Sequence, residues 1–169
     1  CAKDLVKTGE AISKKYGIPI VNKRVAVTPI SMLVGVSGGD PVLYAKTLDK
    51  VANDIGIDFI GGFSALVQKG FAPGDMELIN AIPEALAVTS KLCSSVNIGS
   101  TRAGINLDAV KLMGQKVKEA AELTKDRECI VNNIRNFIEQ NRKYNKSEED
   151  KTHIRKFRHK KSCLYYIIN

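Results

Sequence analysis

The chain has 169 residues, of which 44% are hydrophobic, and a formal net charge of +8. This length and hydrophobic content suit one globular domain with a buried core. Residues 1–121 hold 14 basic and 11 acidic side chains, whereas residues 122–169 hold 12 and 7. The positive charge is therefore concentrated towards the C-terminus, and it does not support nucleic acid or an anionic membrane as a partner.

No apolar run in the sequence approaches the roughly 20 residues that span a bilayer, and the first residues lack the pattern of a secretory leader. We therefore expect a soluble cytoplasmic protein. The four cysteines lack the short spacings of zinc sites and redox pairs, so neither a metal nor a disulfide scaffold is predicted. Because the first residue is Cys and not Met, we expect a partial coding sequence, with processing or trimming as the alternatives.

Four helices are predicted, over residues 4–16, 41–55, 77–90 and 106–121. The second has the clearest signals, because Asp40 suits the N-cap, Pro41 suits the first turn and Gly56 follows the apolar stripe. Pro83 is expected to kink or restart the third helix.

Three strands are predicted, over residues 18–28, 57–60 and 92–98. The second is expected to break at Gly61 and Gly62, where small residues permit a sharp turn or the close approach of a ligand. The strand starts lie 35 to 39 residues apart, and a helix lies between each pair. Parallel strands joined by right-handed crossovers are the economical arrangement, so the sequence predicts an α/β fold.

The composition changes after residue 121. All 13 Gly and all five Pro lie at or before Gly114, and the following segment is rich in Asn, Lys, Ile, Glu and Arg. Since an α/β domain needs Gly and Pro at its turns, this loss indicates a different origin or constraint. An apolar stripe in the tail indicates a chance helix, with a dedicated partner helix as the alternative; it comprises Ile130, Ile134, Phe137 and Ile138.

Three stretches at strand ends are specific enough to compare with a family. They are residues 17–31 (GIPIVNKRVAVTPIS), 58–70 (DFIGGFSALVQKG) and 93–100 (CSSVNIGS). They closely resemble consecutive motifs of the prokaryotic pyruvate-formate-lyase-like family of unknown function. The likeness runs from about residue 1 to residue 124.

The resemblance implies a partial parallel βα barrel of the glycyl-radical-enzyme-like type over residues 1–124, cut from a much longer protein. Residues 125–169 are then expected to be an unrelated helical or disordered tail, produced by a frameshift, a mis-predicted coding sequence or a truncated gene. No glycyl radical segment of the Arg-Val-x-Gly-Tyr type occurs in the chain. We therefore expect the full-length relative to be an enzyme that acts on a small anionic metabolite without such a radical. A non-catalytic metabolite-binding or regulatory protein, or a non-functional product, is the alternative.

The candidate ligand-binding residues are Asn97, Ser100, Thr101 and Arg102, which follow the third strand. In barrels of βα units, ligands bind at the carboxyl ends of the strands, and hydroxyl, amide and guanidinium groups near a helix start hold carboxylates or phosphates. The alternative is that Asn97 to Thr101 only cap and turn the chain. Lys69 is expected to be a solvated loop residue of lesser importance than Arg102.

Other candidates for chemistry are weaker. Cys93 is interpreted as a structural residue, since Ser94 and Ser95 follow it where a radical enzyme of this type has a second cysteine. Both histidines lie in the tail, so no Ser-His-Asp set is predicted before residue 121. The sequence indicates no particular cofactor. An incomplete barrel would leave open sheet edges, so self-association is expected.

Overall fold

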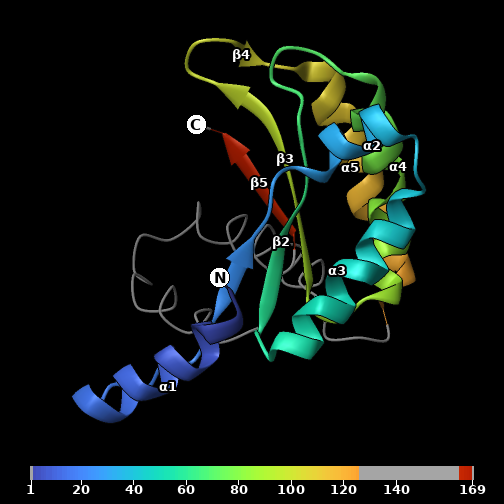
Figure 1. Cartoon of the computed structure of the whole chain (residues 1–169). Coiled ribbons are helices and arrows are strands. Elements are labelled where there is room, and N and C mark those ends of the chain that lie inside the picture. The colour runs from blue at the N-terminus through green and yellow to red at the C-terminus, as the bar shows by residue number, and fades with distance from the viewer. Residues whose placement is uncertain (1, 126–163, 169) are drawn as a thin grey trace.

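The computed structural model describes residues 2–125 and 164–168 (Figure 1). A 3-10 turn (Ala2–Asp4) precedes five α-helices, which are α1 (Leu5–Tyr16), α2 (Ile30–Ser37), α3 (Pro41–Ile55), α4 (Pro73–Val88) and α5 (Leu107–Leu123). The strands are β1 (Arg24–Ala26), β2 (Phe59–Leu66), β3 (Leu92–Ser100), β4 (Gly104–Ile105) and β5 (Leu164–Ile168). The predicted α/β class is confirmed.

The strands form one open, mostly parallel sheet in the order β1-β2-β3-β4. β1 pairs with β2 and β2 pairs with β3 in parallel, which confirms the predicted arrangement of the three strands. β4 is a short antiparallel partner at the end of β3, and β5 pairs in parallel with β3. The described strands do not close into a barrel.

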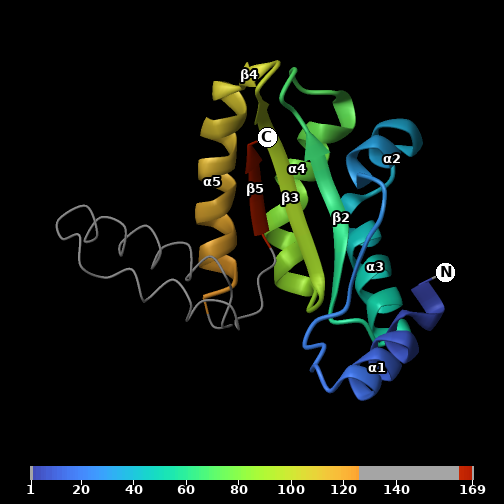
Figure 2. The ribbon, with the colours of Figure 1, turned by 90° about the vertical axis from the view of Figure 1, so that its left-hand side faces the viewer.

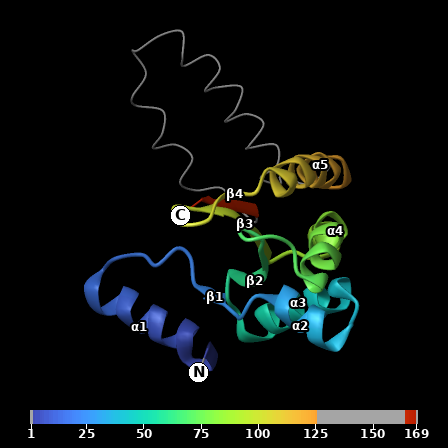
Figure 3. The same cartoon turned by 90° about the horizontal axis from the view of Figure 1, so that it is seen from above.

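Helices α2, α3, α4 and α5 lie along one face of the sheet, whereas α1 lies on the other side beside β1 (Figure 3). The helices bury one face of β3. Alternate residues of this strand are buried, namely Leu92, Ser94, Val96 and Ile98, and the residues between them are only half-buried. The core therefore lies between β2, β3 and the helices, and it includes Phe63, Leu78, Ile79, Ile82 and Met113.

The predicted caps of α3 and α5 are confirmed. Asp40 accepts a hydrogen bond from the backbone N–H of Val42 at 2.9 Å, and Asn106 accepts one from that of Ala109 at 3.2 Å. Each side chain satisfies a backbone donor that has no partner inside the helix. α1 and α3 also end as predicted, at glycines in the left-handed conformation.

Two features near Pro29 differ from the predictions. The first strand has three residues, Arg24–Ala26, and not the eleven of the predicted segment 18–28. Directly after Pro29, α2 forms over Ile30–Ser37, a helix that was not predicted. The helix is short and mostly apolar, with Ser31 and Ser37 as its two polar residues, so it has no polar face from which its period could be recognised.

The second strand continues through Gly61 and Gly62 instead of breaking there. The pairing of β2 with β3 shifts register between Ile60 and Phe63, which indicates a bulge. Gly62 has a φ of 112°, and a Cβ atom there would lie 2.5 Å from Cγ2 of Val27. The glycine therefore permits a bulged strand beside β1. The backbone that approaches it closely is that of Val27, directly after β1, and not a ligand.

α4 begins at Pro73, earlier than the predicted start at residue 77, and it continues past Pro83 to Val88. Asp75 accepts a hydrogen bond from the backbone N–H of Ala72 at 2.8 Å, which ties the loop to the first turn. Pro83 is buried within the helix, so tertiary packing retains it at a position that local preference disfavours.

The tail was expected to be helical or disordered, but its described part, Leu164–Ile168, is a strand beside β3. The sequence LYYII favours a strand, because aromatic and β-branched residues pack well on a pleated surface. The apolar stripe from Ile130 to Ile138 and both histidines lie outside the described residues. Within residues 2–125 no helix has both the length and the apolar character required to cross a membrane.

Candidate ligand site at the carboxyl edge of the sheet

An open cavity of about 490 Å³ lies beyond the carboxyl ends of β2 and β3. It is lined by Gln68, Lys69, Gly70, Phe71, Ala103, Asn106 and Asp108. These residues come from the loop between β2 and α4, from the turn after β3 and from the start of α5, which meet at the upper end of the sheet in Figure 1. Ligands in parallel α/β folds bind at this edge.

Backbone and amide hydrogen bonds hold the two sides of the cavity together. The Val67 carbonyl accepts hydrogen bonds from the Gly70 N–H at 3.1 Å and from Nδ2 of Asn106 at 2.8 Å. The Val67 N–H donates to the Asn97 carbonyl at 2.9 Å. Asn106 therefore caps α5 with its oxygen and anchors the β2–α4 loop with its nitrogen, so both groups of its side chain are used.

The cavity walls carry one cation and one anion. Lys69 and Asp108 are both exposed, and neither forms an ion pair within the described part of the chain. The lysine ammonium is therefore available to an anionic group, whereas the aspartate carboxylate is available to a hydrogen-bond donor. Gln68 adds a neutral amide, whose Oε1 atom is buried and has no hydrogen-bond partner.

The predicted site residues lie beside this cavity but do not line it. Asn97 is on β3, where its Oδ1 accepts a hydrogen bond from the Gly99 N–H at 3.3 Å. Ser100 accepts one from the Ala103 N–H at 3.1 Å, so its hydroxyl stabilises the turn between β3 and β4. Thr101 and Arg102 are exposed in that turn. Along the sequence, β4 lies between these four residues and the start of α5.

Sequence reasoning did not identify Asn106 or Asp108 as lining residues, and it ranked Lys69 below Arg102. A usable signal was present, because Gln68 and Lys69 directly follow a buried parallel strand, and α5 begins with a polar cap. Loops after parallel strands meet at one edge of the sheet. Lys69 and Asp108 are far apart in the sequence, so the sequence alone did not show that they line the same cavity.

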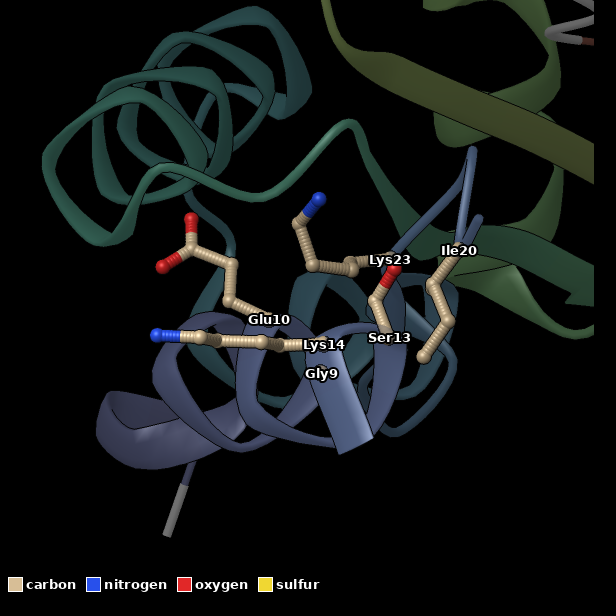
Figure 4. Close-up of a pocket in the computed structure, with 6 residues that line it drawn as sticks. All are labelled: Gly9, Glu10, Ser13, Lys14, Ile20 and Lys23. Carbon is tan, nitrogen blue, oxygen red and sulfur yellow. The ribbon is translucent and has the colours of Figure 1, made fainter. Parts of the chain in front are cut away.

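A second groove, of about 300 Å³, lies between α1 and the segment that leads into β1 (Figure 4). Two of its polar groups already have partners, since the Ser13 hydroxyl donates to the Ile18 carbonyl at 2.8 Å and Lys23 lies 3.6 Å from Asp58. α1 also lies near the amino ends of the strands (Figures 1 and 2). This groove is therefore the weaker candidate for a ligand site.

Two further features lie outside both cavities. Gly38 ends α2 in the left-handed conformation and Asp40 caps α3, so the segment between them joins two helices. Cys93 is half-buried on β3. Among residues 2–125, no three His, Cys, Asp or Glu side chains are grouped so that they could hold a metal ion.

The family model described as "Uncharacterised ACR (DUF711)" matches residues 1–145. The chain belongs to the DUF711 family. It is 59% identical over 130 residues to a UPF0210 protein of Methanococcoides burtonii, and 63% identical over 123 residues to one of Ligilactobacillus salivarius. These matches cover 76% and 72% of this chain but only 29% and 28% of the relatives. The DUF711 chain thus spans less than a third of the length of these curated relatives.

This membership corrects the family inferred from the sequence motifs. The family model and the relatives are DUF711 and UPF0210 proteins, and nothing in them points to a pyruvate-formate-lyase-like family. The three motif stretches lie within the residues matched by the DUF711 model. The family is described as uncharacterised, so its name assigns no reaction.

Proposed function

We propose that this DUF711 chain carries part of a binding site for a small anionic metabolite, located in the cavity at the carboxyl edge of the sheet. The observation that supports the proposal is the Lys69 ammonium, which is unpaired within the described residues at the wall of a cavity of about 490 Å³. Arg102 in the neighbouring turn adds a second cation at the same edge. Positive groups at an open cavity attract an anion and increase its local concentration.

We further propose that the open sheet is a sector of a closed parallel βα barrel in the longer family members. Helices α2 to α5 cover one face, as in a barrel wall, and β1 is the outermost strand of the sheet in the described part of the chain (Figure 3). Closing the sheet would remove that edge. The other face bears small and polar side chains such as Ser95 and Asn97, which suit the inside of a ligand-binding barrel.

The full-length relative is proposed to be an enzyme acting on this metabolite, and a non-catalytic metabolite sensor is the alternative. Fold alone does not decide between them. The experiment is a thermal-shift screen of this chain and of the Methanococcoides burtonii relative against small carboxylates and phosphates. We expect anions to raise the midpoint and Lys69→Met to abolish the rise in this chain.

Turnover of a stabilising compound by the relative supports an enzyme, whereas binding without turnover supports a sensor. Lys118→Met, at an exposed position on α5, is the matched control for the loss of one positive charge. If no anion raises the midpoint, or if Lys118→Met and Lys69→Met reduce the shift equally, the proposed site is wrong.

A further inference from the structure

The Gln68 amide indicates which kind of anion would bind. Its Oε1 atom is the only buried side-chain nitrogen or oxygen in the described part of the chain that has no hydrogen-bond partner. Leaving a buried acceptor unsatisfied costs about 1–3 kcal/mol. Such groups are uncommon in native proteins, and their presence in a cavity wall indicates a missing donor.

The protein groups around the cavity do not supply that donor. Both ends of the Asn106 amide are occupied, by the Val67 carbonyl and by the Ala109 N–H. The Gly70 N–H, next in the loop, donates to Val67 as well. Oε1 is buried in this conformation, and the broad terminal torsion of the Gln68 amide allows the group to rotate when a donor occupies the cavity.

A ligand that satisfies Gln68 must therefore donate a hydrogen bond. A simple carboxylate only accepts, so it could contact Lys69 but would leave Oε1 without a partner. Asp108 in the same wall favours the same property, because its carboxylate also needs a donor and repels a second negative charge. One cation and two acceptors thus match a ligand with one anionic group and one donor group.

We propose that the cavity binds a small carboxylic acid with a hydroxyl or ammonium group on the neighbouring carbon, that is, a hydroxy acid or an amino acid. The carboxylate binds Lys69, and the neighbouring donor binds Gln68, with Asp108 as a further acceptor. This inference rests on the proposed function, since it refines the ligand of the same cavity. It assigns Gln68 the role of a specificity-determining residue.

The test compares three ligands of nearly equal size with the full chain, by saturation-transfer difference NMR, which tolerates self-association. Propionate has only the carboxylate, lactate adds a hydroxyl and alanine adds an ammonium group. We expect lactate or alanine to bind about tenfold more tightly than propionate, which corresponds to one satisfied buried acceptor. The stronger of the two identifies the donor.

Gln68→Met removes the acceptor with little change in volume. The variant should be at least as stable as the wild type, because an unsatisfied group is lost, and it should lose most of the tenfold preference, since Asp108 is then the only acceptor left for the donor. Gln115→Met, an identical change at an exposed position on α5, should leave the tenfold preference intact. Lys69→Met should weaken binding of all three ligands.

The outcomes separate the two proposals. If none of the three ligands binds, the proposed function and this inference both fail. If propionate binds through Lys69 as tightly as lactate and alanine, the anion site is supported and the inference fails. A tenfold preference that is undiminished in Gln68→Met also overturns the inference, because Gln68 would then not be its source.

Discussion

At the residue scale, the glycine with the least room for a side chain is Gly74, where α4 packs against α2. A Cβ atom at Gly74 in α4 would lie 2.2 Å from the Ser31 carbonyl oxygen and 2.4 Å from the backbone nitrogen of Gly35. Both contacts are with the backbone of α2, which a rotamer change cannot relieve. The crossing of α2 and α4 therefore requires a residue without a side chain at position 74.

We expect Gly74→Ala to lower the free energy of unfolding by about 1–3 kcal/mol, the range for overpacked positions. Urea denaturation followed by pulse proteolysis at low protein concentration would measure it. The matched control is Gly114→Ala in α5, where an added Cβ meets no atom within 4 Å. That change should stabilise the protein by about 0.5–1 kcal/mol, because alanine favours the helix. A destabilising Gly114→Ala, or a neutral Gly74→Ala, would contradict the packing argument.

The relative importance of Lys69 and Arg102 is a second question at this scale. The sequence favoured Arg102, because a guanidinium holds a carboxylate through two hydrogen bonds. The structure has Lys69, and not Arg102, in the cavity wall. We now expect Lys69→Ala to weaken binding of a carboxylate several-fold more than Arg102→Ala, as measured by ligand-observed NMR. The opposite ranking would place the anion nearer the β3–β4 turn.

Cys93 remains a predicted structural residue. It lies on β3 between the buried residues Leu92 and Ser94, and no metal-binding group of His, Cys, Asp or Glu is found within residues 2–125. Cys93→Ser in the full-length relative's equivalent position should preserve the ligand-induced thermal shift and any turnover. Complete loss of activity with an unchanged melting curve would show that the thiol takes part in the chemistry.

At the scale of elements, Asn106 joins α5 to the loop after β2. Serine is also a good N-cap, but it has no amide group to donate to the Val67 carbonyl. We expect Asn106→Ser to cost about 1 kcal/mol, the value of one hydrogen bond, and to speed hydrogen exchange at the Gly70 amide. Asp40→Ser is the control, since Asp40 caps α3 through the Val42 N–H, and it should cost less. Equal costs would show that Asn106 acts only as a cap.

At the scale of the whole molecule, the outer edge of β1 is exposed to association. The Lys23 carbonyl and the Val27 N–H bond to residues of β2 and its approach, so the backbone groups of Ala26 between them point the other way. Exposed apolar side chains precede this strand in the chain, including Tyr16, Ile18 and Val21. Unpaired edges of this kind recruit further strands.

We therefore expect the chain, expressed alone, to self-associate as its concentration increases. Sedimentation velocity over a concentration series would measure this. Ala26→Lys should shift the distribution towards the monomer, because a charged side chain on an edge strand opposes pairing. Ala11→Lys, at an exposed position in α1, is the control and should have little effect. A wild-type chain that stays monomeric throughout the series would refute the open-edge argument.

The sequence by itself determined the features that depend on neighbouring residues. Asp40 and Asn106 were recognised as N-caps because a cap needs only a short polar side chain before an apolar stripe. The α/β class and the parallel pairing also followed from the sequence, since strands separated by helices have few alternatives. The motif stretches showed that a family could be assigned, but they did not assign the correct one.

Only the tertiary structure decided the features that depend on residues distant in the sequence. The glycine pair in β2 seemed to break the strand, and contact with Val27 shows instead that it lets two strands approach. α2 has no polar face, so it becomes recognisable as a helix only when it packs on α4. The candidate site has the same origin, because Gln68 and Asp108 are 40 residues apart and meet only where the loops after parallel strands converge at one edge.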